Sequence, residues 1–360
     1  MYKRQESPSE FYDIELFGSD NKTVVDLDGN IHTPLFDTTV NLMYKAVLKE
    51  DPTNFEKGDY NVQITIPGKY TVENGDNEKP DTLPALREWK GGKGEFTLTD
   101  TSAIVIAPSA DARTEEIAND VKDFFKDMLG REIAVKKGEA AAGDVSLKLD
   151  SSIPEMGEEG YYMNVTDKVV ITSPGYTGLL YGGITATQIL YDDEDHLNIP
   201  QGIARDYPMY EVRSGMVDVA RAFVPMDYLK EITRYFSWFK LNELHLHVND
   251  RGENNYQAFR IESDLEGLTA TDGSYSKEEY REYQREALKY GIHVVTEFET
   301  PGHANSFGNI PGISMLDPSH INIGDEASVN IVKSLFDEML GGDDPVIIKE
   351  NKVVHIGTDE

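Results

Sequence analysis

Apolar and polar residues follow three successive patterns along the chain. In the first part the clearest strand is residues 60–66, where apolar and polar side chains alternate strictly until a Pro-Gly pair ends the run. Residues 11–17 and 39–48 are weaker strand candidates. Such short alternating strands predict a small Ig-like β-sandwich over residues 1–88.

Proline and glycine residues separate this part from the next. Their run between residues 78 and 94 is the clearest linker signal in the chain. Beyond it, a buried strand at 104–106 precedes a helix that we expect Thr114 to cap and Gly130 to end. The other predicted elements are three strands and a second helix, at residues 145–149, 161–165, 169–172 and 179–191. We predict an α+β domain over residues 94–207, with helices on one face of a sheet.

The last part repeats a strand followed by a helix. Short apolar runs predict buried parallel strands at residues 216–218, 243–247, 292–298 and 353–356. Between them, amphipathic helices are predicted at residues 226–239, 276–290 and 329–339. Four such repeats, without a final helix, predict the first half of a (β/α)8 TIM barrel over residues 208–360. A doubly wound sheet is the alternative, although no Gly-rich phosphate loop follows the first strand.

Composition excludes several classes of protein. The 360 residues include 65 acidic and 34 basic side chains, a net charge of −31 that repels nucleic acids and anionic membranes. There are no cysteines, so disulfides and thiolate metal sites are excluded. No apolar run is long enough for a membrane span, and no apolar segment near the N-terminus predicts a signal peptide in this chain.

The chain ends just after its last predicted strand, on the adjacent carboxylates Asp359 and Glu360. Neither a helix nor a capping residue follows them. We therefore expect the coding region to continue beyond Glu360. Half a barrel lacks half of its pocket wall and leaves a sheet edge open, so we expect the 360-residue chain itself to be inactive.

Polar residues follow every predicted strand of the barrel. The carboxyl ends of barrel strands carry the active site, and so many ionisable groups there would be costly to desolvate unless they served one. The candidates, in chain order, are Arg213, Asp218, Arg221, His247, Asn249, Asp250, Glu297, Glu299, His303, Asp359 and Glu360. The paired Asp359 and Glu360 suit general acid catalysis.

Structural roles compete with catalytic ones for some of these residues. Asp218 and Arg221 are expected to form a structural ion pair, and Glu297 is expected only to orient its neighbours. We interpret His245 and His247 as pointing in opposite directions from one strand, so that one of them is a packed barrel histidine.

A metal site built from His247, Asp250 and His303 is another interpretation of these residues. The spacing of these residues fits no metal motif. We therefore predict that the protein uses neither a metal nor another cofactor.

Four motifs resemble, in order, those of the glycoside hydrolase family 20 β-N-acetylhexosaminidases. They are RSGMVDVAR at 213–221, LNELHLHVND at 241–250, EFETPGH at 297–303 and HIGTDE at 355–360. The resemblance covers residues 208–360. It extends to the preceding domain, where EGY at 159–161 and GLLYGG at 178–183 are similar to the companion domain of that family.

The resemblance implies substrate-assisted hydrolysis with retention, in which the 2-acetamido oxygen of the substrate replaces an enzymatic nucleophile. By motif, Asp359 would hold the acetamido N–H and stabilise the oxazolinium ion. Glu360 would protonate the leaving oxygen and then activate water. Arg213 would bind sugar hydroxyls, and Asp250 with His303 would support Glu360.

Some positions depart from the family pattern. Most members have Gly at position 358 and commonly Asp at position 299, where this chain has Thr358 and Glu299. Residues 258–263 and 268–273 are similar to members that release disaccharides such as lacto-N-biose. The resemblance therefore implies a glycan partner with a terminal β-linked N-acetylhexosamine or lacto-N-biose, acted on by a secreted or cell-surface bacterial protein.

A function without turnover is the alternative. The predicted sandwich and the missing half of the barrel are also compatible with a glycan-binding or adhesion fragment. The predicted sandwich shows no aromatic platform in its sequence, so a spacer role competes with binding.

Overall fold

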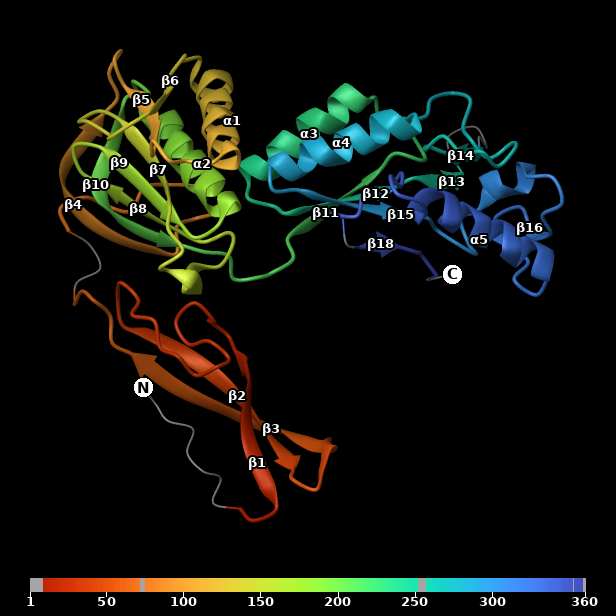
Figure 1. The fold of residues 1–360 in the computed structure, drawn as a ribbon, viewed down its shortest axis with the longest axis horizontal. Coiled ribbons are helices and arrows are strands. Elements are labelled where there is room, and N and C mark those ends of the chain that lie inside the picture. Colours follow the sequence, from red (N-terminus) through yellow and green to blue (C-terminus); the bar gives the residue numbers. More distant parts are fainter. Residues whose placement is uncertain (1–8, 72–74, 252–256, 352, 359–360) are drawn as a thin grey trace. The chain divides into compact units, whose positions relative to one another are not determined.

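The chain forms two compact units, Met1–Glu211 and Val212–Glu360. The computed structural model describes residues 9–71, 75–251, 257–351 and 353–358. Figure 1 shows the course of the chain through both units. Among the described residues, no helix has the length and apolar character that a membrane crossing requires.

The first unit begins with a single antiparallel sheet of three strands. The strands are β1 (Tyr12–Ser19), β2 (Thr38–Leu48) and β3 (Asp51–Ile66), in that order. The buried face of this sheet, with Val40 and Leu42, packs against Val24 and Val25 of the loop that joins β1 to β2. The predicted β-sandwich is wrong for described residues 9–71, because a loop covers the sheet where a second sheet was expected.

A mixed sheet of seven strands forms the rest of the first unit. In sheet order it consists of β4 (Glu88–Thr97), β10 (Asn198–Asp206), β8 (Tyr161–Val165), β9 (Val169–Ser173), β7 (Val145–Leu149), β5 (Ala103–Ile106) and β6 (Ala134–Lys137). Helices α1 (Ala112–Leu129) and α2 (Tyr176–Asp192) lie side by side against it (Figure 1), and a 3-10 turn spans Pro154–Met156. The predicted strands and helices of this part are confirmed within a few residues.

The glycine-rich stretch that was predicted to be a linker is instead part of strand β4. Residues 88–91 and 95–97 pair with β10 in the seven-stranded sheet, and residues 92–94 lie at a register shift between them. At Gly91 a Cβ atom would collide with the Asn77 carbonyl oxygen, so glycine is needed because another backbone segment passes close by.

Helix α1 also begins earlier than predicted. Its N-cap is Asp111, whose side chain accepts a hydrogen bond of 2.8 Å from the backbone N–H of Thr114. Thr114 is therefore inside the first turn. Gly130 ends the helix with φ of 63°, as predicted.

The second unit is built on a parallel sheet whose strands and helices alternate as predicted. The strands are β11 (Ser214–Asp218), β12 (Glu243–His247), β15 (His293–Glu297) and β18 (Val354–His355), in that order. The helices are α3 (Met226–Trp238), α4 (Lys277–Lys289) and α5 (Glu326–Leu340). Smaller elements are the strands β13 (Asn249–Arg251), β14 (Gln257–Phe259), β16 (Met315–Asp317) and β17 (His320–Ile321) and a 3-10 turn at Asn305–Asn309.

The two faces of this parallel sheet differ in chemistry. Leu244, Leu246 and Val294 belong to one hydrophobic core that all three helices share. Alternate residues, among them His245 and His247, point to the opposite face. A doubly wound sheet would carry helices on both faces, so the shared core favours the barrel-like arrangement.

Candidate active site

A row of four polar side chains crosses the carboxyl edge of the parallel sheet. The register pairs Asp218 with His247, His247 with Glu297, and Glu297 with His355. Residues directly opposite each other on neighbouring strands share a face, so these side chains converge. The sequence analysis singled out Asp218, His247 and Glu297 but not His355, and the register adds that all four are direct neighbours.

His247 lies between two carboxylates and is buried. Its Nδ1 is 2.5 Å from Glu297 Oε2 and its Nε2 is 2.9 Å from Asp250 Oδ2. Burial alone would lower the pKa of His247, but the hydrogen bonds to Asp250 and Glu297 raise it to about 10. The ring is therefore an imidazolium that donates from both nitrogens.

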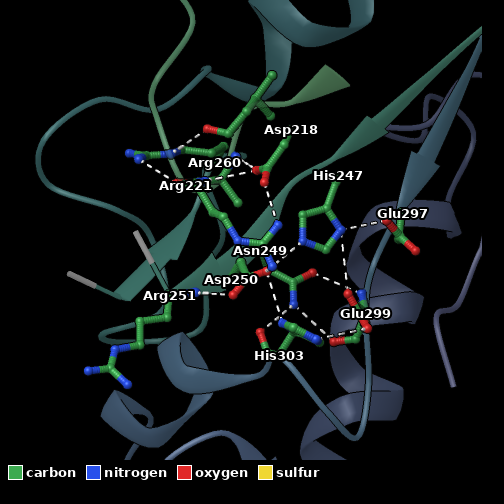
Figure 2. A network of polar contacts seen from close by, with 12 residues as sticks. Asp218, Arg221, His247, Asn249, Asp250, Arg251, Arg260, Glu297, Glu299 and His303 are labelled. Atoms are coloured by element: carbon green, nitrogen blue, oxygen red, sulfur yellow. Dashed lines mark hydrogen bonds and ion pairs between the residues drawn. The ribbon is translucent and has the colours of Figure 1, made fainter. Parts of the chain in front are cut away.

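Asp250 collects contacts from three sides, as Figure 2 shows. Besides His247, it receives His303 Nδ1 at 2.9 Å and Arg221 Nη2 at 2.5 Å. Burial would raise the pKa of Asp250, but the hydrogen bonds from His247, the Arg251 backbone and His303 lower it to about 2. Asp250 thus stays ionised at neutral pH, and the structure brings Asp250 and His303 together as the resemblance implied.

Arg221 has two roles where one was expected. Its Nη1 lies 2.5 Å from Asp218 Oδ2, so the predicted ion pair is present. The same guanidinium contacts Asp250 through its second nitrogen. Arg221 therefore links the end of β11 to the segment after β12, which pairwise spacing in the sequence did not reveal.

Glu297 was expected to orient its neighbours, and it contacts three of them. Its carboxylate lies 2.5 Å from His247 Nδ1, 2.7 Å from His355 Nδ1 and 3.3 Å from His245 Nε2. Burial would raise its pKa, but the neighbouring imidazoles of His245 and His247 hold the pKa of Glu297 well below its usual range. His245 and His247 both reach Glu297, so the prediction that they point in opposite directions is wrong: residues i and i+2 of a strand share a face.

Asn249 fixes the loop that carries Glu299 and His303 (Figure 2). Its Nδ2 donates to the carbonyl oxygens of Glu299 and His303, at 2.9 and 3.2 Å, and its Oδ1 accepts from the Glu299 N–H at 2.9 Å. A buried amide satisfied by backbone groups positions that loop without adding charge.

Arg260 is a buried cation that sequence reasoning did not single out. It is 1% exposed and pairs with Asp272. Its other N–H groups donate to the carbonyl oxygens of Val219, Ala220 and Gly273 at 2.8 to 2.9 Å. Arg260 thereby joins the segment after β11 to the loop at residues 268–273.

Among the described residues, two groups of side chains have the residue types of a metal site: His245, Glu297 and His355, and His247, Glu297 and Glu299. Ligand atoms about 2.0–2.2 Å from a zinc ion are roughly 3 Å or more apart. The Nδ1 atoms of His247 and His355 lie closer than that to Glu297, at 2.5 and 2.7 Å. These separations are those of direct ion pairs, so the side chains form an ion-pair network.

The chain after β18 passes close to the network. Backbone N–H groups of Phe298 and Thr300 donate to the carbonyl oxygens of His355 and Ile356, at 3.0 and 3.4 Å. A Cβ atom at Gly357, where φ is 66°, would collide with Glu299. Thr358 has φ of 79°, a conformation that suits glycine and is strained for a β-branched residue.

Not all predicted site residues gather here. Asp359 and Glu360 lie outside the described residues. Arg213 precedes β11 at the opposite end of the sheet, where its Nε donates to the Lys240 carbonyl oxygen at 2.7 Å. The structure therefore brings Asp250 and His303 together and leaves Arg213 apart from them.

Comparison with known proteins supports both parts of the chain. The profile "Glycosyl hydrolase family 20, domain 2" matches residues 79–207, and "Glycosyl hydrolase family 20, catalytic domain" matches residues 210–360. A lacto-N-biosidase of Bifidobacterium bifidum is 26% identical over 291 residues, which cover 78% of this chain and 24% of that protein. A β-N-acetylhexosaminidase of Cellulomonas fimi is 30% identical over 239 residues, covering 62% of this chain and 46% of the relative. The chain thus spans less than half the length of both relatives.

Solved structures show the same fold. The β-N-acetylhexosaminidase of Streptomyces coelicolor superimposes with a TM-score of 0.59 at 25% identity, covering 71% of this chain and 56% of that one. The exo-β-N-acetylglucosaminidase of Vibrio harveyi gives a TM-score of 0.64 at 18% identity, covering 89% and 53%. The second likeness concerns the fold alone.

Proposed function

This chain belongs to glycoside hydrolase family 20, and from that membership we propose that it is part of an exo-acting, retaining glycosidase. The proposed substrate is a glycan with a terminal β-linked N-acetylhexosamine or lacto-N-biose. The proposed fold of residues 208–360 is the first half of a (β/α)8 barrel. The observation that supports this most is the ionised network at the carboxyl edge of the parallel sheet, beside the strand that precedes Asp359 and Glu360.

The proposed reaction uses the acetamido group of the substrate as nucleophile. Its carbonyl oxygen attacks the anomeric carbon while the glycosidic bond breaks and Glu360 gives its proton to the leaving oxygen. Glu360, now a carboxylate, takes a proton from water, which opens the oxazolinium ion and restores the original configuration. Asp359 accepts a hydrogen bond from the acetamido N–H, and its negative charge balances the positive charge of the oxazolinium ion.

The described residues supply support for Glu360. Asp250 stays ionised and His303 lies 2.9 Å from it, and we propose that this pair acts on Glu360. A general acid needs a raised pKa, and a nearby buried carboxylate favours its protonated form. The binding of sugar hydroxyls by Arg213 stays a prediction from the resemblance.

Two substrates deserve separate assays. The likeness to a protein named lacto-N-biosidase supports the disaccharide, and the likeness to β-N-acetylhexosaminidases supports the monosaccharide. The full gene product should be tested on an aryl N-acetylglucosaminide and an aryl lacto-N-bioside. We also propose a secreted or cell-surface location, where such glycans are found, which fractionation of the producing cells would check.

Replacement of the proposed acid is the decisive experiment. In the full gene product, Glu360→Gln should lower turnover by about 10²- to 10⁴-fold, because a positioned general acid contributes roughly that much. The exposed Glu350→Gln makes the same chemical change elsewhere and should leave turnover unaltered. A loss of less than about tenfold for Glu360→Gln would refute the assignment. Glycan binding without hydrolysis by the wild type would favour the binding alternative.

A further inference from the structure

Strand β18 leads directly to the proposed catalytic pair, yet it is very short. It consists of Val354 and His355, which pair with Thr296 and Glu297 of β15. Two backbone hydrogen bonds continue the pairing to residue 300, and the second of these is long, at 3.4 Å. A strand with so few backbone contacts is weakly fixed unless side chains help to hold it.

Glu297 provides such a side-chain contact. One of its oxygens, Oε1, lies 2.7 Å from His355 Nδ1, which belongs to β18. The other, Oε2, lies 2.5 Å from His247 Nδ1 and 3.3 Å from His245 Nε2, both on β12. A single buried carboxylate therefore contacts imidazoles from the strands on both sides of its own.

The contact on the β12 side reaches the supporting pair of the proposed acid. His247 contacts Glu297 through Nδ1 and Asp250 through Nε2, and Asp250 in turn contacts His303. A displacement of Glu297 would therefore move the Asp250–His303 pair on one side and strand β18 on the other. Displacement of about 1 Å can cost roughly 10²-fold in rate.

We propose that Glu297 is a positioning residue that fixes β18, the strand that precedes the proposed catalytic residues in the chain, relative to the Asp250–His303 pair. This inference rests on the proposed function. Glu297 holds no substrate in this role and transfers no proton. It acts through His355 on one side and through His247 on the other.

The charge of Glu297 is essential to the proposed role. A carboxylate offers acceptors on both oxygens, which suits several imidazole N–H donors at once. Glutamine has the same shape but only one acceptor oxygen, and its NH2 group would face a donor. Glu297→Gln therefore removes the charge that pairs with His247 and His355 and weakens the contacts to both.

The electrostatic surroundings of His247 provide an independent measurement. Charged or titratable groups on several elements face it: Asp218, Arg221, Asp250, Glu297, Glu299 and His303. Loss of the Glu297 charge removes one of the two hydrogen bonds that raise the pKa of His247, so this pKa should fall from about 10 toward its ordinary value.

The first experiment measures structure in the 360-residue chain. Histidine-selective ¹⁵N NMR gives the pKa of His247, and hydrogen exchange gives the protection of the Phe298 and Thr300 amides, which donate to β18. In Glu297→Gln we expect a lower pKa and at least tenfold faster exchange of both amides. Glu338→Gln is the matched control: Glu338 is largely buried and binds Lys277 and Ser263, away from the network. It should leave both readouts unchanged.

The second experiment measures catalysis in the full gene product. Glu297→Gln should lower kcat at least tenfold with KM changed less than threefold, because it displaces the acid without touching substrate. Glu338→Gln should retain kcat. If the wild type hydrolyses neither aryl substrate, the proposed function fails, whereas the NMR and exchange results still decide whether Glu297 fixes β18.

A second variant keeps the test decisive if Glu297→Gln does not fold. His355 is half exposed, so His355→Gln removes only the β18 side of the cluster. It should speed exchange of the Phe298 and Thr300 amides while His247 keeps its high pKa. Unchanged exchange in His355→Gln, or unchanged exchange and kcat within twofold in Glu297→Gln, would overturn the proposal.

Discussion

His247 shows how a buried residue keeps a charge. Its side chain is 4% exposed, a position that would ordinarily favour the neutral imidazole. Asp250 and Glu297 each accept a hydrogen bond from one ring nitrogen, and this stabilisation exceeds the free-energy cost of burying the charged ring. Removal of a partner from such a buried group is costly, since the remaining charges stay buried without compensation.

The stability of the second unit should depend on pH through His247. Its folded pKa, about 10, is above the unfolded value of about 6.5, so its contribution is fully present below pH 6.5 and is lost as the pH rises through 10. His247→Gln should cost about 3 kcal/mol of unfolding free energy at pH 6.5 and much less at pH 10. Urea unfolding at several pH values measures this.

At low pH the stability of the second unit should depend on Asp250, with the opposite direction of change. The folded pKa of Asp250, about 2, is below its unfolded value, so its contribution is present above about pH 4 and is lost as the pH falls through 2.

The control for the His247→Gln variant is His320→Gln, which removes a surface partner of Asp317 and should change stability little at any pH. Equal losses for His247→Gln at pH 6.5 and pH 10 would contradict the assigned charge.

At the scale of elements, Arg260 holds together segments that share no sheet. Its guanidinium donates to the carbonyl oxygens after β11, at Val219 and Ala220, and binds Asp272 in the loop that precedes α4. Lysine carries the same charge but has no planar fork of donors, so it cannot make all of these contacts.

Arg260→Lys should therefore destabilise the second unit by about 3 kcal/mol, the cost of leaving buried acceptors unsatisfied around a displaced charge. Chemical denaturation measures the loss. Arg285→Lys makes the same change at a half-exposed pair with Asp344 and should cost no more than about 0.5 kcal/mol. Similar losses for the two variants would show that the buried fork contributes little.

At the scale of the whole molecule, the two units have separate cores, and each has its own buried arginine. Arg205, which is fully buried and pairs with Glu88, belongs to the first unit, and Arg260 belongs to the second. Units with separate cores unfold independently unless a large interface couples them.

We therefore expect two calorimetric transitions for the 360-residue chain. Arg205→Lys should lower the Tm of one, and Arg260→Lys that of the other, each by several degrees. In the described residues β11 and β18 each pair with one neighbour, and Met216 and Ile356 are more than half exposed, so the second transition should depend on protein concentration. A single transition that both variants shift equally would contradict independent units.

The sequence by itself determined most of the local structure. The apolar periods gave the strands and helices of the second unit within a few residues, because each buried face repeats at the period of its element. The predicted helix at residues 276–290 is α4, which Ser276 caps, and the ordered motifs identified the family. Polar residues at the strand ends indicated the candidate site, because burial of charged groups is costly unless they have a function.

Only the tertiary structure decided which of these residues touch. The register placed Glu297 between His247 and His355, and it gave Arg221 a second partner. The structure also places Arg213 before the amino end of β11, away from the site, and shows that the predicted linker belongs to strand β4. Within the site such contacts join residues as many as 110 positions apart in sequence, as in the pair of His245 with His355. Local periodicity carries no information about them, because pairing between strands is set by packing of the whole sheet.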